Sequence, residues 1–212
     1  MAPGALQHQI RLIVITDRPQ AHPRPVEDVV REALAAGAPA VQLRDKAATA
    51  RELLTTARRL RALTGETGAL LFVNDRLDVA LAAGADGAHL GPDDVPLSAA
   101  RTAAPPGFLL GVSTDDPQDA RQAEAEGADY IGCGTVYDTA SKRDAGEVIG
   151  LEGLRRVTEA VSIPVVGIGG IAPHRAQEVA SAGAAGCAAI GAVMGAKDPG
   201  SVVRTFLTPF DD

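Results

Sequence analysis

A short run near the start of the chain alternates polar and apolar side chains. In an extended strand, residues two apart share a face, so Gln42, Arg44 and Lys46 are expected on one face, opposite Val41 and Leu43. Two cations and an amide would then converge. A solvated edge strand shows the same alternation, so this run needs the rest of the chain before it indicates a site.

Four similar glycine joints divide the chain. Each follows an Ala-rich amphipathic stretch and precedes an apolar run, and they read Ala36-Gly37-Ala38, Ala83-Gly84-Ala85, Glu126-Gly127-Ala128 and Ala182-Gly183-Ala184. Glycine at a helix C-terminus is free to take positive φ and so to direct the chain into the next strand. The joints therefore mark helix-to-strand junctions.

Counting outward from these junctions predicts eight apolar strands that alternate with eight helices. The strands are expected at residues 11–16, 40–44, 69–74, 87–90, 109–113, 130–134, 164–169 and 186–191. The helices are expected to begin near Val26, Thr49, Arg76, Pro96, Pro117, Leu151, Pro173 and Pro199. Proline suits a first helical turn because its φ is fixed and it lacks an N–H donor.

Eight alternating units with continuously apolar strands favour an α/β fold, a (β/α)8 TIM barrel formed as a single domain over residues 1–212. Residues 1–9 are expected to be a flexible N-terminal extension. A doubly wound open sheet is the alternative. It usually has fewer units and a glycine fingerprint after the first strand, where this chain has Thr16-Asp17-Arg18-Pro19.

The composition and the net charge indicate which partners and which cellular compartment to expect. Hydrophobic residues make up 46% of the chain but aromatic residues only 3%, so small aliphatic side chains must build the core. The net charge of −7 argues against a nucleic acid or an anionic membrane as partner. Cys133 and Cys187 lie in apolar runs and are expected to be buried thiols in a reducing compartment. With no signal peptide and no membrane span recognised, a cytoplasmic protein is expected.

Polar residues gather after the expected strands, where barrel enzymes carry their chemistry. Arg44 and Lys46 follow the second strand, Asp75 the third, Asp94 the fourth and Ser113 the fifth. Carboxylates beside cations would hold a metal-bound diphosphate, since Mg²⁺ takes oxygen ligands. Each carboxylate has an ordinary alternative, because Asp75 could cap the next helix and Asp93 or Asp94 could serve a turn before Pro96.

Two glycine-containing strand ends and one long loop add a phosphate signal. Gly169-Gly170 and Gly191-Ala192 end the last two strands, where backbone N–H groups can approach an anion. The loop at residues 134–144 is polar and long for a compact barrel, and its hydroxyls and Lys142 can donate to phosphate oxygens. Tight turns and a solvated connector are the alternatives.

The histidines carry less information. His89 lies within the fourth strand and is expected in the barrel interior, while His8, His22 and His174 are expected on the surface. The order of residues typical of a Ser/His/Asp hydrolase is not recognised, nor is a Cys/His spacing typical of zinc sites. Covalent hydrolysis and zinc chemistry are therefore disfavoured.

Six motifs occur in a fixed order between the first strand and the last helix. They read Gln42-Leu43-Arg44-Asp45-Lys46, Asn74-Asp75-Arg76, Asp86-Gly87-Ala88-His89-Leu90-Gly91-Pro92-Asp93-Asp94, Gly111-Val112-Ser113, Thr139-Ala140-Ser141-Lys142 and Gly167-Ile168-Gly169-Gly170-Ile171. Together they resemble thiamine-phosphate synthase. The resemblance implies a (β/α)8 transferase of thiamine biosynthesis that, with Mg²⁺, joins 4-amino-2-methyl-5-hydroxymethylpyrimidine diphosphate to 4-methyl-5-(2-phosphoethyl)thiazole and releases thiamine phosphate and diphosphate.

The resemblance also assigns roles position by position. Gln42 would orient the pyrimidine, and Asp75 and Asp94 would ligate magnesium. The residues that would bind the diphosphate are Arg44, Lys46, Asn74, Ser113 and Lys142. The thiazole phosphate would be held by two hydroxyls and by backbone groups, namely Thr139, Ser141, Gly170, Gly191, Ala192 and Val193. The catalytic set within these is Arg44, Lys46, Ser113 and Lys142.

The implied reaction needs charge neutralisation and water exclusion. In such enzymes diphosphate leaves first, and the thiazole nitrogen traps the pyrimidine carbocation, so a strong protein nucleophile is not required. The sequence departs from the family pattern mainly on the thiazole side. Thr135 and Asp138 replace prolines, Ser141 replaces a threonine, Pro92 a glutamine and Gly191 a serine.

Two other functions fit parts of this pattern. A thiazole tautomerase-like isomerase of the same fold would bind the thiazole phosphate but would have no use for cations and carboxylates around a diphosphate. A non-catalytic phosphate-ligand sensor could keep the whole site without turnover. The sequence leaves open whether the chain forms a homo-oligomer.

Overall fold

Eight parallel strands form a closed barrel in the computed structural model, which describes residues 3–139 and 147–210. The strands are β1 (Leu12–Ile15), β2 (Ala40–Leu43), β3 (Leu70–Asn74), β4 (Gly87–Leu90), β5 (Leu109–Ser113), β6 (Tyr130–Cys133), β7 (Val165–Ile168) and β8 (Gly186–Ala189). They pair in chain order, and β8 closes on β1. The predicted (β/α)8 barrel is confirmed, and only the strand ends differ, by one or two residues.

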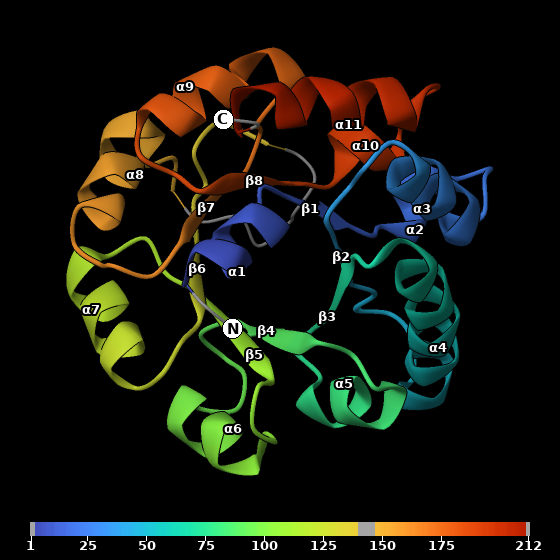
Figure 1. Cartoon of the computed structure of the whole chain (residues 1–212), viewed down its shortest axis with the longest axis horizontal. Coiled ribbons are helices and arrows are strands. Elements are labelled where there is room, and N and C mark those ends of the chain that lie inside the picture. The colour runs from blue at the N-terminus through green and yellow to red at the C-terminus, as the bar shows by residue number, and fades with distance from the viewer. Residues whose placement is uncertain (1–2, 140–146, 211–212) are drawn as a thin grey trace.

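Helices surround the barrel as an outer ring (Figure 1). They are α1 (Pro3–Gln9), α2 (Arg18–Ala21), α3 (Val26–Ala35), α4 (Ala50–Thr67), α5 (Leu77–Ala83), α6 (Leu97–Ala103), α7 (Pro117–Ala125), α8 (Gly150–Thr158), α9 (Ala176–Ser181), α10 (Gly191–Met194) and α11 (Pro199–Leu207). Two 3₁₀ turns, η1 (Pro173–Arg175) and η2 (Thr208–Phe210), complete the elements. The helix expected to start at Pro173 thus begins as a 3₁₀ turn, and α2 and α10 were not expected.

Alternate residues of each strand enter two different cores. In β1, Leu12 and Val14 face the helices, while Ile13 and Ile15 belong to a separate apolar cluster inside the barrel. This division explains why the strands read as continuous apolar runs, since both faces of a barrel strand are covered. The interior cluster fills the lower part of the barrel and leaves its carboxyl end to polar groups.

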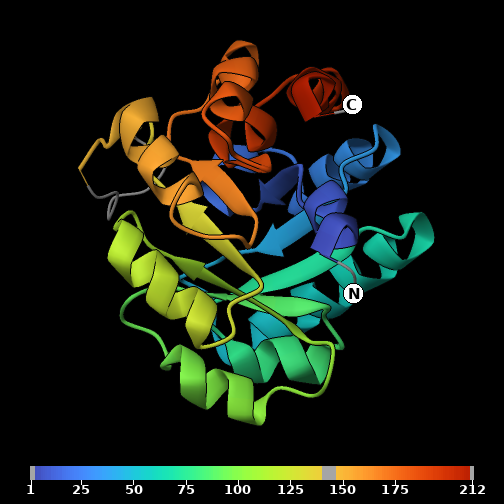
Figure 2. The same cartoon turned by 60° about the vertical axis from the view of Figure 1, so that its left-hand side comes forward.

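Helix α1 corrects the expectation that residues 1–9 form a flexible extension. Residues 3–9 are helical, and Leu6 and Ile10 are buried in the interior cluster beside Leu70 and Leu109, which begin their strands. The helix therefore closes the amino end of the barrel, and it lies across the middle of the ring in Figure 1 and at the barrel's end in Figure 2. A helix this short carries little sequence signal, because its stability comes from packing.

Truncating the buried side chain of α1 should destabilise the protein. Leu6→Ala is expected to lower the free energy of unfolding by about 2–3 kcal/mol, as buried leucines do when they are truncated. Leu81→Ala is the control, since Leu81 on α5 is exposed and its truncation should cost less than about 1 kcal/mol. Urea denaturation measures both. Equal, small effects would mean that α1 is detached from the barrel in solution.

Candidate functional site

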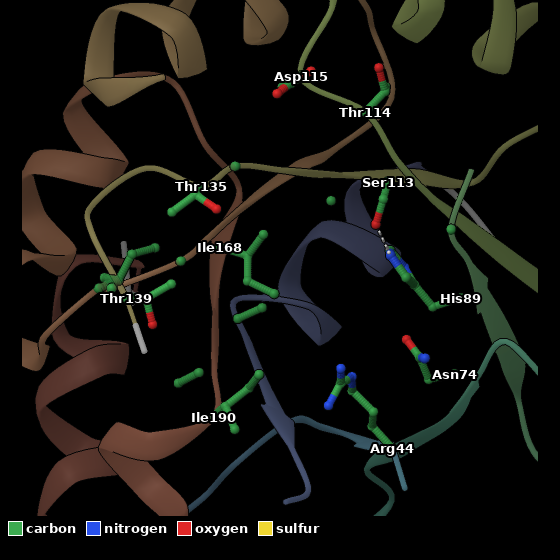
Figure 3. Close-up of a pocket in the computed structure, with 18 of the residues that line it drawn as sticks. Arg44, Asn74, His89, Ser113, Thr114, Asp115, Thr135, Thr139, Ile168 and Ile190 are labelled. Atoms are coloured by element: carbon green, nitrogen blue, oxygen red, sulfur yellow. Dashed lines mark hydrogen bonds between the residues drawn. The ribbon is translucent and has the colours of Figure 1, made fainter. Parts of the chain in front are cut away.

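A cavity of about 400 Å³ opens at the carboxyl end of the barrel. Residues that follow β2 to β8 line it, so it lies where barrel enzymes carry their chemistry. Its volume lies within the range of small-ligand sites. Figure 3 shows Arg44, Asn74 and His89 along one wall, with Thr135, Thr139 and Ile190 on the opposite side.

The cationic wall begins where β2 ends. Arg44 and Lys46 lie beyond the last strand residue, Leu43, and both line the cavity. The buried hydroxyl of Thr16 accepts a hydrogen bond from the Arg44 N–H at 2.9 Å and donates to the Arg44 carbonyl at 3.1 Å. Thr16 thus holds both the N–H and the carbonyl of Arg44. The Arg44 guanidinium projects into the cavity (Figure 3).

Gln42 lies deeper than the sequence suggests. Its side chain is on the face opposite Val41 and Leu43, as predicted, but it is only 3% exposed and does not line the main cavity. It borders a small void beneath the cavity together with Tyr130. Strand alternation predicts the face of a residue but not its depth in the barrel. In this structure a bound molecule in the main cavity would not contact Gln42.

Two carboxylates meet at the ends of β3 and β4. The Asp75 carboxyl is close enough to Asp94 to share a hydrogen bond with it, and its pKa is raised to about 6, chiefly by burial and then by the Asp94 charge, while Lys46 and Arg44 act in the opposite direction. Asn74 Nδ2 donates to Asp75 Oδ1. The site therefore concentrates negative charge at one point on a cationic wall.

Backbone geometry holds both carboxylates in place. Asp75 has φ of 64°, in the left-handed region, and its N–H donates to the His89 carbonyl at 2.9 Å. Asp94 Oδ2 accepts from the Gly91 N–H at 2.7 Å. A non-glycine residue in this region is uncommon and persists where the surroundings impose it. Asp75 makes no capping bond to α5, so the capping alternative is not supported.

The donor chemistry fits a magnesium ion. Magnesium prefers oxygen ligands and is usually held by one or two carboxylates together with substrate phosphates and waters. Asp75 and Asp94 supply two carboxylates that repel each other without a cation between them. Within residues 3–139 and 147–210, no group of three or more His, Cys, Asp and Glu side chains is placed to hold a metal.

Ser113 and His89 form the floor of the cavity. His89 Nε2 is 2.8 Å from Ser113 Oγ, and His89 Nδ1 is 2.9 Å from the Tyr130 hydroxyl. The prediction that His89 lies in the barrel interior is confirmed, since it is 8% exposed. Tyr130 was not among the predicted site residues, because its contact with His89 joins two strands that are not adjacent in the barrel.

Backbone hydrogen bonds join the two loops that form the wall opposite the cations. Val136 N–H donates to the Ile168 carbonyl at 2.9 Å and Tyr137 N–H to the Gly169 carbonyl at 3.0 Å, so the loop after β6 continues alongside the end of β7. Gly170 makes this approach feasible, because a Cβ there would lie 2.4 Å from the Asp138 carbonyl oxygen. The two loops therefore meet without side chains between them.

The predicted thiazole-phosphate residues divide into three groups. Thr139, Gly170, Gly191 and Ala192 line the cavity. Val193 does not line the cavity; its side chain is fully buried in the outer core and its N–H donates to the Ile190 carbonyl at 3.1 Å. Ser141 lies outside the residues that the structure describes, as does Lys142 of the predicted diphosphate set.

Several cavity residues were not among the predicted ones. They include Thr114 and Asp115 after β5, Thr135 after β6 and Ile190 after β8. Their positions directly after strands are the signal that could have found them. Asp115 adds a further carboxylate on the side of the cavity away from Arg44 (Figure 3).

Adding a methyl group at Gly170 should disrupt the junction of the two loops. Gly170→Ala combines a left-handed backbone, φ of 59°, with a clash against two carbonyl oxygens. Gly84→Ala is the control, because Gly84 has φ of 65° with no atom within 4 Å of the added Cβ. We expect about 1 kcal/mol of destabilisation at Gly84 and 1–3 kcal/mol more at Gly170. Equal effects in thermal unfolding would contradict the close contact.

Comparisons with known proteins agree on one family. The family described as thiamine monophosphate synthase matches residues 12–193. The thiamine-phosphate synthase of Moorella thermoacetica is 52% identical over 181 residues, 85% of this chain and 86% of the relative. That of Pyrococcus furiosus is 50% identical over 193 residues, 91% of each. The solved structure of thiamine phosphate pyrophosphorylase from Pyrococcus furiosus superposes with a TM-score of 0.88 at 45% identity, covering 97% of this chain and 98% of that one.

The comparisons cover the whole cavity. Residues 12–193 include every strand and every cavity-lining residue named above. Among the described residues, no helix is both long and apolar enough to cross a membrane.

Proposed function

The chain belongs to the thiamine monophosphate synthase family, and from this premise we propose that it is a thiamine-phosphate synthase, a transferase of thiamine biosynthesis. Its substrates would be the pyrimidine diphosphate and the thiazole phosphate named above, and its products thiamine phosphate and diphosphate. The observation that carries this proposal is the pairing of two carboxylates with Arg44 and Lys46 at the mouth of the barrel. That combination suits a diphosphate and its metal.

The diphosphate would lie against the cationic wall. Arg44 can bind two phosphate oxygens through its planar guanidinium, and Lys46 adds a second positive charge in the same wall. Asn74 and Ser113 also line the cavity, and their neutral side chains can donate hydrogen bonds. Lys142, which lies outside the described residues, is proposed to approach from the loop after β6. Together these groups neutralise negative charge that builds on the leaving group.

Asp75 and Asp94 are proposed to hold Mg²⁺. The ion would supply Lewis-acid stabilisation of the departing diphosphate. The pKa of Asp75 is raised by burial and by repulsion from Asp94. A positive ion between the two carboxylates would reduce that repulsion. The Gly91 N–H orients Asp94, and the backbone bond to His89 orients Asp75.

The thiazole phosphate would occupy the opposite wall. Backbone N–H groups near Gly170, Gly191 and Ala192, with the Thr139 hydroxyl, line that side without adding a positive charge. Ser141 is proposed as a further donor from the loop. Substrates bound on opposite walls would bring the thiazole nitrogen toward the pyrimidine methylene carbon, and holding them in this orientation is itself a large part of catalysis.

The reaction would use charge stabilisation in place of a protein nucleophile. The C–O bond to diphosphate breaks with its electron pair leaving on the diphosphate, and the thiazole nitrogen lone pair then forms the new C–N bond. The two cysteines are unsuited as nucleophiles, because burial raises the pKa of Cys133 and of Cys187 to about 12. The chain's own contribution is to orient both substrates and to exclude water from the reacting carbon.

Purified protein tests the proposal directly. With both substrates and Mg²⁺, ³¹P NMR should show thiamine phosphate and diphosphate appearing in equal amounts, and neither should form when one substrate is omitted. Turnover of thiazole phosphate alone would indicate the tautomerase-like isomerase. Tight binding with no product would indicate the sensor. Either result would overturn the synthase proposal.

Two expectations stay predictions. The sequence predicts a cytoplasmic location, and it leaves open whether the chain forms a homo-oligomer. Both can be measured, the first by fractionation of cells and the second by light scattering of the purified protein.

A further inference from the structure

A line of hydrogen bonds crosses the barrel interior and ends at the cavity floor. The Tyr130 hydroxyl lies 2.9 Å from His89 Nδ1, and His89 Nε2 lies 2.8 Å from Ser113 Oγ. Gln42 and Tyr130 border the same small void below the cavity. Three strands, β4, β5 and β6, each contribute one member of the line, which crosses a largely apolar interior.

The backbone makes room for the two rings. Gly111 is paired with both His89 and Tyr130 in the sheet, and a Cβ there would lie 2.1 Å from the Tyr130 ring. A Cβ at Gly132 would lie 2.9 Å from His89 Cε1. Because both strands carry glycine where a ring must lie, the positions of Tyr130 and His89 depend on one another. Tyr130 also packs edge-on against Phe72, with ring centroids 5.3 Å apart.

The direction of the protons follows from the partners. Burial raises the pKa of Tyr130 far above its ordinary value, so the phenol keeps its proton. The phenol proton is then donated to His89 Nδ1. A neutral imidazole carries its single proton on the other nitrogen, and so donates from Nε2 to Ser113 Oγ.

We propose that Tyr130 and His89 are positioning residues that fix the Ser113 hydroxyl as a hydrogen-bond donor into the cavity. With its proton on Nε2, His89 donates to Ser113 Oγ at 2.8 Å, and the hydroxyl keeps its own proton for a group in the cavity that it lines (Figure 3). In the proposed function, on which this inference rests, that group is the departing diphosphate. The hydroxyl would be oriented before the substrate binds, at no cost in reorganisation during the reaction.

The tautomer of His89 tests the inference without any turnover. Long-range ¹H–¹⁵N correlation spectra distinguish Nε2–H from Nδ1–H histidines, and the chain has only four histidines. The His89→Gln variant identifies the His89 signals. We expect the Nε2–H tautomer in the wild type and its partial loss in Tyr130→Phe. An Nδ1–H tautomer in the wild type, or a spectrum unchanged by Tyr130→Phe, would overturn the proposal.

Kinetics test whether the line acts through Ser113. Tyr130→Phe should lower kcat about fivefold to tenfold with little change in KM, as expected for one neutral hydrogen bond. Ser113→Ala should lower it more, and adding Tyr130→Phe to Ser113→Ala should change nothing further, because residues that act as one unit are not additive. His89→Gln, which can place an amide N–H near Ser113, should retain more activity than His89→Leu.

A control variant separates positioning from stability. Thr158→Val removes a hydroxyl that bonds the Ala182 carbonyl at 2.9 Å, away from the cavity, and should leave kcat unchanged. Additive losses in the double variant, or equal losses in Thr158→Val and Tyr130→Phe, would show that the line has only a structural role. If the wild type formed no product, the proposed function would fail, while the tautomer measurement would still decide the geometry.

Discussion

Replacing Asp75 by asparagine is expected to stabilise the metal-free protein while removing magnesium-dependent turnover. The pKa of Asp75 is raised from 3.8 to about 6, first by burial and then by Asp94. A carboxyl whose pKa is higher in the folded state binds its proton more tightly there. Its contribution to stability is therefore present below pH 3.8 and is lost as the pH rises through 6. At neutral pH the ionised Asp75 destabilises the folded protein.

Asparagine removes that charge and keeps the backbone. It tolerates the left-handed conformation that Asp75 adopts, with φ of 64°. Because a half-exposed carboxyl is partly screened by water, we expect a gain of about 1 kcal/mol, or about 2–4 °C in Tm, at pH 8. The gain over the wild type should shrink as the pH falls from 6 to 4. Differential scanning calorimetry in the presence of a chelator measures it.

The activity of Asp75→Asn should fall although its stability rises. Loss of a proposed magnesium ligand should lower kcat/KM at least about 100-fold, since even outer partners of metal ligands are worth 10- to 100-fold. Asp78→Asn is the control: the hydrogen bonds from Arg76 lower the pKa of Asp78, so this variant should not gain stability and should keep its activity. An Asp75→Asn protein that keeps its activity would refute the assignment of Asp75 as a magnesium ligand. One that is less stable than the wild type would refute the electrostatic argument.

Arg44→Ala should produce the second large effect, on the diphosphate substrate alone. Truncating one partner of a close charge pair in a partly buried site costs about 2–5 kcal/mol, which corresponds to roughly 30- to 5,000-fold in kcat/KM for the pyrimidine diphosphate. KM for the thiazole phosphate should change less than threefold, because Arg44 lies on the other wall. Steady-state kinetics with each substrate varied in turn measure the difference.

A neighbouring arginine provides the matched control. Arg18 forms an exposed ion pair with Asp45 at 2.8 Å beside the same loop, and it does not line the cavity. Arg18→Ala removes the same charge, yet it should leave both KM values within about twofold, since exposed pairs contribute little. Equal losses in the two variants would mean that net charge near the loop matters and the Arg44 contact does not.

The fold could be predicted because the repeated βα unit has a local sequence pattern. Gly84 and Gly127 take positive φ after their helices, as the joints predict, and Thr49 caps α4 through a reciprocal bond with Glu52. Continuous apolar runs mark the strands, since barrel strands are covered on both faces. Helix α1 was missed because its stability depends on a docking site that the rest of the chain must first build.

The site could be predicted only through the rule that functional residues follow the carboxyl ends of barrel strands. That rule placed Arg44, Asp75 and Ser113 around one cavity, as the structure shows. It could not give depth, and the buried Gln42 is not among the residues that line the main cavity. Val193, which the family resemblance assigned through its backbone, has its side chain in the core. The rings of Tyr130 and His89 occupy spaces that Gly111 and Gly132 leave, and such spaces exist only once the strands are in register.

The most direct test of the account is a crystal structure of the protein with thiamine phosphate, diphosphate and Mg²⁺. We predict the diphosphate against Arg44 and Lys46, the ion between it and the carboxylates of Asp75 and Asp94, and the thiazole phosphate against the backbone near Gly170. A diphosphate bound on the glycine side, or a metal held away from both carboxylates, would contradict the central claim that this cavity performs the transfer.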